Sequence, residues 1–352
     1  MAVDEARLNA FMGAFVNDLG AVMHAATIVV GDQLGLYKAL AAGPPSTAEA
    51  LAQRTETDAR YLREWLSAQA ASGYVEYDPA NDQFSMNAEQ AFALAEEGSP
   101  AFVPGAFQIA TAQFKAIPKM VQAFRTGLGL GWHEHDTALF HGTERFFRPG
   151  YAANLVDKWL PALEGVEAKL KRGARVADVG CGHGASTLIM AQAYPQSRFT
   201  GYDFHAPSIE IAKQSADRAG LNGRLNFEVA SAKTYPGRGF DLVAVFDCLH
   251  DMGDPVGAAT HVRETLNADG TWLIVEPFAN DSLRANLNPV GRIFYSASTM
   301  ICTPASRAQE VGLCLGAQAG EARTRDVVTR GGFSRFRRAT ETPFNLVYEA
   351  RP

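Results

Sequence analysis

Residues 174–184 read Ala-Arg-Val-Ala-Asp-Val-Gly-Cys-Gly-His-Gly, and the helix-compatible run Ala-Ser-Thr-Leu-Ile-Met-Ala-Gln-Ala follows at 185–193. The short apolar run ends in Asp178, and three glycines stand at alternate positions after it. A strand, a glycine turn and a helix in this order begin the nucleotide-binding half of an open α/β sheet. Glycines let the backbone approach a ligand without a Cβ in the way, and a helix start offers free N–H groups to an anionic group.

Two cofactors are compatible with this turn. The spacing Gly180-x-Gly182-x-x-Ala185 satisfies the permissive dinucleotide pattern, so a nicotinamide-dependent oxidoreductase is one interpretation. The tighter description, Asp-x-Gly-x-Gly-x-Gly, resembles motif I of the class I S-adenosylmethionine (SAM) methyltransferases. In that family the carboxylate at the Asp178 position lies near the methionine end of SAM, and the glycines pass beneath the cofactor.

The order of elements after the turn favours SAM. Residues 198–203 read as a second strand ending in Asp203, a carboxylate that can accept both hydroxyls of a ribose. The later pattern predicts helices at 207–220, 258–266, near 306–317 and at 322–330, and strands at 225–230, 240–246, 271–275, 333–339 and 344–350. A closing hairpin implies an antiparallel last strand, and this order resembles the class I methyltransferase sheet over residues 174–352. We therefore predict an α/β fold with a Rossmann-like seven-stranded sheet.

The resemblance implies a set of cofactor-binding residues. One position departs from the family, because Ser231 stands where these enzymes often carry an acid that contacts the adenine amino group, and a hydroxyl is a weaker acceptor than a carboxylate. We assign to the SAM site Asp178, Gly180, Cys181, Gly182, Gly184, Asp203, Phe204, Ser231, Ala232 and Asp247.

A candidate base follows the fourth predicted strand in the segment Asp247-Cys-Leu-His250-Asp251-Met252. The carboxyl ends of strands in an open α/β sheet face the ligand crevice. The segment resembles the His-Asp-Trp motif of plant-type and hydroxyindole-type O-methyltransferases, with Met252 in place of Trp. The resemblance implies His250 as general base and Glu276, at the end of the fifth strand, as its orienting acid, with Asp251 beside them. Packing of His250 against cofactor or substrate, without proton transfer, is the alternative.

The first 95 residues predict helix, helix, helix and a β-wing: a helical stretch over 8–42, a helix capped by Ser46, a helix from Thr57 to Gly73, and short strands at 74–78 and 83–86. A winged helix suggests DNA binding, but this region carries twelve acids and five bases, a net charge of −7. Because DNA affinity is dominated by phosphate neutralisation, we expect no nucleic-acid partner. The arrangement resembles small-molecule O-methyltransferases, which implies a homodimer through the apolar face of helix 8–30.

Residues 96–170 connect the two parts and are rich in aromatics. A glycine run at 127–131 is predicted to be a flexible hinge, and Trp132-His133-Glu134-His135-Asp136 follows it. This cluster has three interpretations: a metal site, a solvated loop, or a wall of the substrate cavity. We assign Trp132, His133 and His135 to the substrate site and predict no metal. The segment 277–305, with Phe294 and Tyr295, is expected to cap the same pocket.

Length and composition agree with a soluble enzyme of two domains. The chain has 352 residues, 47% hydrophobic residues and a net charge of −6, and its four cysteines show no CxxC spacing. We expect a cytoplasmic protein without a membrane span, divided into a dimerisation domain at 1–95, a helical connector or lid at 96–170, and a SAM-binding domain at 171–352. The whole-chain pattern looks like a mycobacterial, actinobacterial group of winged-helix methyltransferases.

The function expected from these observations is transfer of a methyl group from SAM to a small, partly apolar acceptor, at oxygen, with His250 as base. An S-, N- or C-methyltransferase without a dedicated base is an alternative. A ligand-sensing winged-helix transcription regulator is an alternative of another class. The sequence does not name the acceptor.

Overall fold

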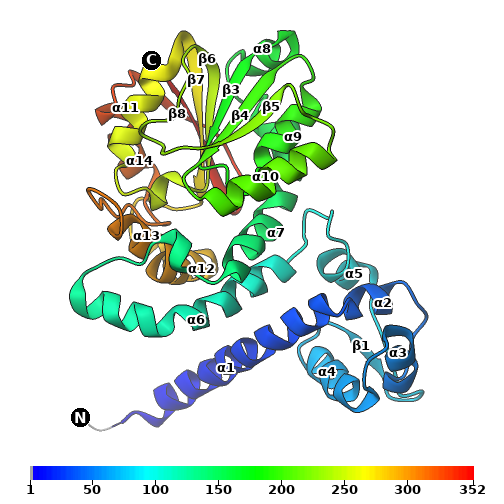
Figure 1. Cartoon of the computed structure of the whole chain (residues 1–352). Helices are drawn as coiled ribbons and strands as arrows, with labels where there is room; N and C mark the ends of the chain where they lie inside the picture. Colours follow the sequence, from blue (N-terminus) through cyan, green and yellow to red (C-terminus); the bar gives the residue numbers. More distant parts are fainter. Residues whose placement is uncertain (1–2) are drawn as a thin grey trace. The chain divides into compact units, whose positions relative to one another are not determined.

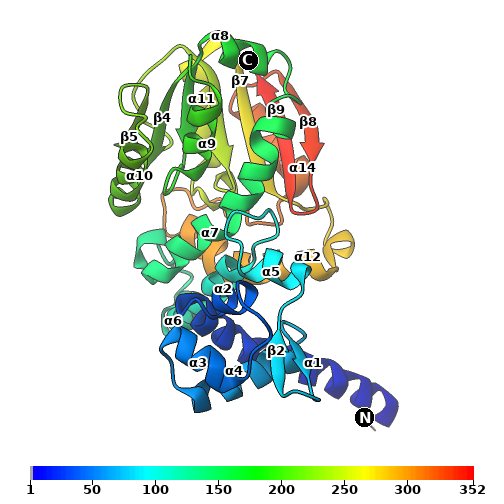
Figure 2. The same ribbon diagram turned by 90° about the vertical axis from the view of Figure 1, so that its right-hand side faces the viewer.

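The computed structural model describes residues 3–352, which form two compact units (Figures 1 and 2). One unit comprises the chain up to Phe114 together with His141–Pro149, and the other comprises Lys115–Phe140 with Gly150–Pro352. The helices α6 (Pro104–Thr126) and α7 (Thr137–Asn154) therefore contribute to both units. The division predicted at residues 95 and 170 stays a prediction.

The first unit has the expected order of helices and wing. It contains α1 (Glu5–Gln33), α2 (Leu36–Ala41), α3 (Ala48–Thr55), α4 (Ala59–Ala71), the antiparallel strands β1 (Glu76–Asp78) and β2 (Gln83–Ser85), and α5 (Ala88–Leu94). The stretch with predicted helical periodicity over 8–42 forms two helices, which break at Gly35, where φ is a left-handed 68°. The cap of α3 is Thr47, whose hydroxyl accepts from the Ala50 N–H, while the Ser46 hydroxyl donates to the Pro44 carbonyl. The cap prediction was wrong by one residue.

The core of this unit explains why its helices stay together. Ile28 of α1, Leu51 of α3 and Leu66 of α4 are fully buried in one apolar cluster. Gly31 allows α1 to approach α4 closely, because a Cβ there would lie 2.3 Å from the ring of Trp65. The indole N–H of Trp65 donates to the Thr27 carbonyl. Only the C-terminal part of α1 joins this cluster, and its first five turns are exposed.

The second unit is built on a seven-stranded sheet of order β5-β4-β3-β6-β7-β9-β8. The strands are β3 (Arg175–Val179), β4 (Arg198–Asp203), β5 (Leu225–Val229), β6 (Phe240–Phe246), β7 (Leu266–Pro277), β8 (Arg335–Glu341) and β9 (Asn345–Arg351). The first five are parallel, and β9 inserts antiparallel between β7 and β8. The predicted seven-stranded sheet with an antiparallel last strand is confirmed.

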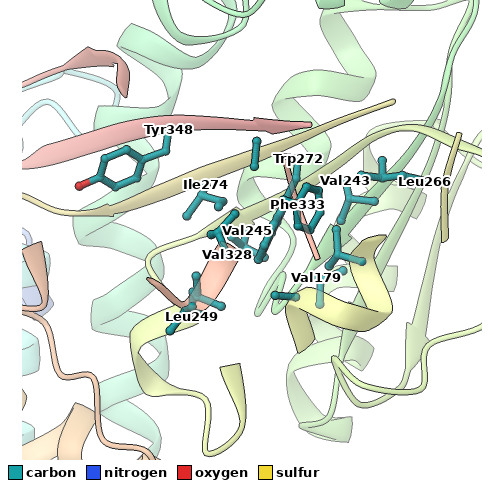
Figure 3. Packing of buried hydrophobic residues seen from close by; sticks show 14 of the residues in the cluster. Val179, Val243, Val245, Leu249, Leu266, Trp272, Ile274, Val328, Phe333 and Tyr348 are labelled. Atoms are coloured by element: carbon teal, nitrogen blue, oxygen red, sulfur yellow. The ribbon is translucent and has the colours of Figure 1, made fainter. Parts of the chain in front are cut away.

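Helices cover both faces of this sheet (Figures 1 and 2). They include α8 (Val166–Arg172), α9 (Ala185–Ala193), α10 (Ala206–Arg218), α11 (Pro255–Thr265) and α14 (Gly320–Arg330). Because a parallel sheet is buried on both faces, its central strand β6 is continuously apolar from Leu242 to Phe246. On one face, Val328 of α14 and Val262 of α11 pack with Trp272 of β7 in the main core (Figure 3).

The segment between β7 and α14 differs partly from expectation. It holds the short turn η4 (Arg284–Asn286), α12 (Pro289–Ala297), the π-helical η5 (Ser298–Cys302) and α13 (Thr303–Arg307). The helix expected near 306–317 is wrong beyond Arg307, because Val311, Gly312, Cys314 and Gly316 all have positive φ, which a right-handed helix excludes.

The glycine run at 127–131 is packed against α13. The Leu130 N–H donates to the Pro304 carbonyl, and the Arg307 guanidinium donates to the Gly127 carbonyl. A Cβ at Gly129 would lie 2.1 Å from the Ala308 nitrogen. The glycine at 129 is thus required by close backbone approach, a constraint that the hinge prediction missed.

Candidate functional site

The glycine turn after β3 has the backbone that its sequence requires. Gly180, Gly182 and Gly184 have φ values of 76°, 53° and 80°, all in the left-handed region that favours glycine. A Cβ at Gly180 would lie 2.6 Å from the Cys248 sulfur, and one at Gly184 would lie 2.5 Å from the ring of Phe227. A Cβ at Gly182 would meet nothing within 4 Å. A side chain at either of the outer two glycines would overlap its neighbours, whereas the middle glycine faces open space beside the backbone.

Asp178, at the end of β3, presents an unpaired oxygen. The side chain is fully buried, and its Oδ2 accepts from the Ser186 and Thr187 hydroxyls at 2.6 and 2.7 Å. Its Oδ1 has no hydrogen-bond partner among the described residues. Burial raises the pKa of Asp178 to about 6, against the opposing effect of the two hydroxyls. Because buried polar atoms are normally hydrogen-bonded, this oxygen fits a ligand that brings its own donor, such as an ammonium group.

Asp203 joins the end of β4 to the same turn. Its carboxylate accepts the Gly182 N–H at 2.9 Å and the His205 N–H at 2.8 Å. Burial raises its pKa. Each oxygen keeps a further lone pair, so the group retains the capacity to accept the two hydroxyls of a ribose.

The other residues predicted to contact the cofactor lie at the ends of the neighbouring strands. Phe204 follows Asp203 and is half exposed. Ser231 and Ala232 follow β5, where Ser231 is exposed and its hydroxyl accepts from the Lys233 N–H at 3.3 Å. Cys181 is buried within the turn. The structure therefore gathers the predicted cofactor residues along the carboxyl ends of β3, β4, β5 and β6, and their roles remain proposals.

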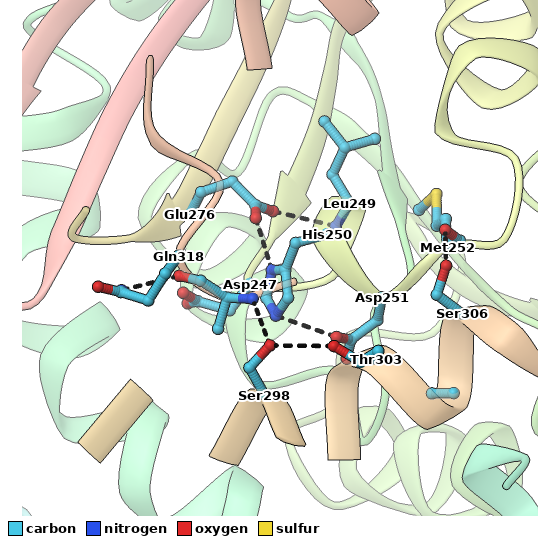
Figure 4. Close-up of polar contacts among 12 residues, drawn as sticks. Asp247, Leu249, His250, Asp251, Met252, Glu276, Ser298, Thr303, Ser306 and Gln318 are labelled. Carbon is cyan, nitrogen blue, oxygen red and sulfur yellow. Dashed lines mark hydrogen bonds and ion pairs between the residues drawn. The ribbon is translucent and has the colours of Figure 1, made fainter. Parts of the chain in front are cut away.

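His250 lies between two carboxylates just beyond β6, in the short helix η3 (Leu249–Asp251) (Figure 4). Its Nδ1 is 2.5 Å from Glu276 Oε2 and its Nε2 is 3.0 Å from Asp251 Oδ1. Glu276 is fixed by a second bond, because its Oε1 accepts the Leu249 N–H at 3.0 Å. Burial opposes charge on the imidazole, but Asp251 and Glu276 together outweigh it and raise the pKa of His250 well above its usual value.

Asp247 is a second, partly buried acid at this edge of the sheet. It is not a glycine and yet has a left-handed φ of 50°. Its Oδ2 accepts from the Tyr151 hydroxyl at 2.9 Å, and its Oδ1 accepts from the Asn345 amide at 3.0 Å. Burial, and then the charge of Glu276, raise the pKa of Asp247 to about 7.

The residues predicted to bind the acceptor differ in their burial and contacts. His135 is buried, its Nε2 has no hydrogen-bond partner among the described residues, and burial lowers its pKa. Trp132 packs on Phe140, which in turn packs on His205. By contrast, His133 is exposed. In the cap, Phe294 is buried and Tyr295 is half-buried.

The loop 132–136 is held at defined points. The Lys119 ammonium donates to the Glu134 carbonyl at 2.6 Å, Lys115 pairs with Asp136 at 2.9 Å, and Glu134 accepts the Gly131 N–H. Neither His133 nor His135 belongs to a cluster of three close potential metal ligands among the described residues. The interpretation of this loop as a metal site therefore gains no support.

Sequence reasoning missed three side chains that the fold brings to the site. Tyr151 and Asn345 bond to Asp247 from 96 and 98 positions away along the chain. Cys302 is buried beside His250 and Asp251, with one ligand atom from each residue within 4.8 Å of the others, and burial raises its pKa to about 12. No local motif signals any of the three, because only the packing of α7, η5 and β9 brings them to the sheet edge.

Comparisons with known proteins identify two domains in the chain. Residues 170–321 match a methyltransferase domain, and residues 22–96 match an Rv2258c-like winged helix-turn-helix domain. A mitomycin biosynthesis 6-O-methyltransferase from Streptomyces lavendulae is 26% identical over 272 residues, which is 74% of this chain and 76% of that protein. Other curated relatives align over short stretches. Trans-aconitate 2-methyltransferase from Streptomyces avermitilis is 38% identical over 20% of this chain and 26% of its own length. A polyketide synthase from Burkholderia thailandensis matches over 5% of its length.

Solved structures cover the whole chain. The mitomycin 7-O-methyltransferase MmcR superposes with a TM-score of 0.72 at 21% identity, covering 99% of this chain and 100% of that one. Human N-acetylserotonin methyltransferase, solved with SAM, gives 0.74 at 17% identity, covering 100% and 99%. The chain thus carries a methyltransferase domain with a Rossmann-like fold, C-terminal in sequence to a winged helix-turn-helix domain.

Proposed function

We propose that this protein transfers a methyl group from SAM to an oxygen of a small, partly apolar acceptor, with His250 as general base. The observation that carries the proposal is the Glu276–His250 pair at the end of β6, on the strand edge that also holds the glycine turn. When bound, SAM supplies a methyl group on a sulfonium leaving group. The tasks left to the protein are to align the acceptor, exclude water and accept the proton of the acceptor hydroxyl.

The residues of the turn fit the cofactor. The unpaired Oδ1 of Asp178 suits its ammonium group, the lone pairs of Asp203 suit its ribose hydroxyls, and the open space at Gly182 suits close passage over the backbone. These assignments rest on the donor and acceptor chemistry of each group. We also assign Phe204, Ser231 and Ala232 to the adenine side from their place after β4 and β5.

Glu276 supports the base in two ways. Its bond to the Leu249 N–H fixes the carboxylate, and its bond to His250 Nδ1 holds the ring so that Nε2 is the nitrogen left for an acceptor. In the structure, Nε2 of His250 faces Asp251. Proton transfer therefore requires the acceptor to take the place of Asp251 at Nε2, and it requires His250 to be neutral. Since two carboxylates raise its pKa, the base-competent fraction of the enzyme grows as the pH rises.

Replacement of the base tests the proposal. Incubation with trideuteromethyl-labelled SAM and a cell extract, read by mass spectrometry, identifies the acceptor from a labelled product. With that acceptor, His250→Ala is expected to lower turnover by about 10²–10⁴-fold while SAM binding holds. His261→Ala is the matched control, because His261 lies in α11 and bonds to the Tyr235 carbonyl away from the site. Unchanged turnover in His250→Ala would favour an S-, N- or C-acceptor that needs no base.

We further propose a cytoplasmic homodimer formed through α1. Its exposed apolar side chains recur every three or four residues along the first five turns, and they comprise Leu8, Phe11, Met12, Phe15, Val16, Leu19, Val22 and Met23. By length and composition α1 is also the one helix among the described residues that could cross a membrane. The His24–Gln69 hydrogen bond and the buried Ile28 fix the end of α1 in the winged-helix core, which favours a protein partner for the rest.

A DNA-binding regulator is the alternative that the winged helix raises. The two arginines of α4, the helix in the recognition position, are already paired: Arg60 with Glu64 at 2.5 Å and Arg63 with Asp82 at 2.7 Å. Together with the net charge of −7 over residues 1–95, this pairing leaves little positive charge for phosphates. Binding of genomic DNA fragments with a steep salt dependence would revive the alternative.

A further inference from the structure

Asp247 combines a left-handed backbone with a partly buried carboxylate. A left-handed conformation is costly for residues other than glycine and is tolerated best by asparagine and aspartate, and it persists where the surroundings enforce it, often at functional sites. Here it directly follows β6, the central parallel strand. The conformation therefore places a carboxylate at the carboxyl end of the strand that carries the base.

The partners of Asp247 leave its charge uncompensated. Tyr151 on α7 and Asn345 on β9 each donate one hydrogen bond, and both are neutral groups. The charged groups that face it are Glu276 on β7 together with His250 and Asp251 on η3. This cluster holds three carboxylates and one imidazole. The imidazole is already engaged by Glu276 and Asp251, so Asp247 is the acid without a cationic partner of its own.

The chain segment 247–249 links the glycine turn to the base. The Cys248 thiol donates to the Val179 carbonyl at 3.3 Å and lies against Gly180, and the Leu249 N–H is held by Glu276. A methyl donor held by the turn has to present its reacting atom toward His250, because transfer requires near-contact of donor and acceptor. On the proposed function, the cationic sulfur that carries the methyl group would lie along this segment.

We infer that Asp247 is the counter-ion of the SAM sulfonium and that it makes the protein prefer cationic SAM over the neutral thioether product, S-adenosylhomocysteine. Transfer breaks the bond between sulfur and methyl as the bond between acceptor and methyl forms, and the sulfur keeps the electron pair and loses its charge. The attraction to Asp247 then disappears. Asp247 thus favours binding of the substrate form and release of the spent form.

The proposal predicts a pH dependence with a definite sign. Burial raises the pKa of Asp247 to about 7, so the carboxyl is largely protonated at pH 6 and ionised at pH 8. A cation binds the ionised form, so affinity for SAM rises over this interval and levels off above it. His250, Glu276 and Asp251 also lie within reach of the sulfonium charge. The pH dependence of the ratio of the two dissociation constants is therefore assigned to Asp247 by its loss in Asp247→Asn.

Titration calorimetry with SAM and with S-adenosylhomocysteine tests the inference without an acceptor. Asp247→Asn keeps the left-handed backbone accessible and removes the charge. We expect the Kd for SAM to rise about tenfold, which is about 1.4 kcal/mol, and the Kd for S-adenosylhomocysteine to change less than about threefold. Asp241→Asn is the matched control, because Asp241 lies at the other end of β6 and bonds to the Arg175 N–H and to Asn267. It should leave both constants nearly unchanged.

Each outcome bears on the proposal. An equal loss of affinity for both ligands would mean that Asp247 contacts a part they share, such as the amino-acid end, and would overturn the proposal. Unchanged affinity for both ligands would also overturn it. If Asp247→Asn does not fold, the unmodified protein decides: its SAM preference must increase several-fold from pH 6 to pH 8, and a flat ratio refutes the idea. Failure of the wild-type chain to bind either ligand would instead count against the methyltransferase function.

Discussion

Gly182→Ala should separate cofactor binding from folding. An added Cβ at Gly182 meets no protein atom within 4 Å, so the only cost to the fold is the left-handed φ of 53°. That cost is about 1–2 kcal/mol for alanine. The same Cβ projects into the open space that we assign to SAM. We expect a fold of nearly normal stability whose affinity for SAM and for S-adenosylhomocysteine falls at least tenfold.

The neighbouring glycine provides a contrast. A Cβ at Gly184 would lie 2.5 Å from the ring of Phe227, which adds an overpacking cost of about 1–3 kcal/mol to the backbone cost. Gly184→Ala should therefore destabilise the protein more than Gly182→Ala. The control is Gly220→Ala, because Gly220 also has a positive φ, of 65°, with no atom within 4 Å of an added Cβ, and it follows α10 away from the turn.

Thermal denaturation and titration calorimetry with S-adenosylhomocysteine measure the two effects separately. Gly182→Ala and Gly220→Ala should show similar losses of stability, and only Gly182→Ala should lose affinity. Wild-type affinity in Gly182→Ala would refute the assignment of the open space to the cofactor. Unfolding of Gly182→Ala while Gly220→Ala stays folded would refute the claim that no protein atom opposes a side chain there.

Two further predictions concern the base and the dimer. Glu276→Gln removes one of the two carboxylates that stabilise the imidazolium, so the pKa of His250 should fall. The pH titration of the His250 ring protons in NMR spectra measures this pKa. An unchanged pKa would mean that Asp251 alone stabilises the imidazolium. Phe11→Glu places a charge on the exposed apolar face of α1 and should convert a dimer to a monomer in light scattering after size exclusion, while Tyr61→Glu, at the more exposed position on α4, should not. A dimer that persists in Phe11→Glu would place the interface elsewhere.

The sequence pattern was most informative where a short segment determines its own conformation. The glycine turn, the acid ending β4 and the closing hairpin were all predicted, because glycine spacing, strand alternation and chain reversal are local properties. The pattern failed at 308–317, where four residues with positive φ follow α13. Apolar residues there suggested a helix, and only contacts with the neighbouring segments fix their conformation. One such contact is the Cys314 N–H bond to the Ser306 hydroxyl.

The candidate site likewise has features that the sequence predicts and features that only the tertiary structure shows. The sequence by itself determined the sheet, its glycine turn and the presence of His250 and Glu276 at strand ends, because the carboxyl ends of parallel strands meet at one edge. Only the tertiary structure decided that Asp251 also faces His250 and that Tyr151 and Asn345 fix Asp247. It also buried His250 and partly buried Asp247. Burial and neighbouring charge, which no linear pattern encodes, shift the pKa of both groups.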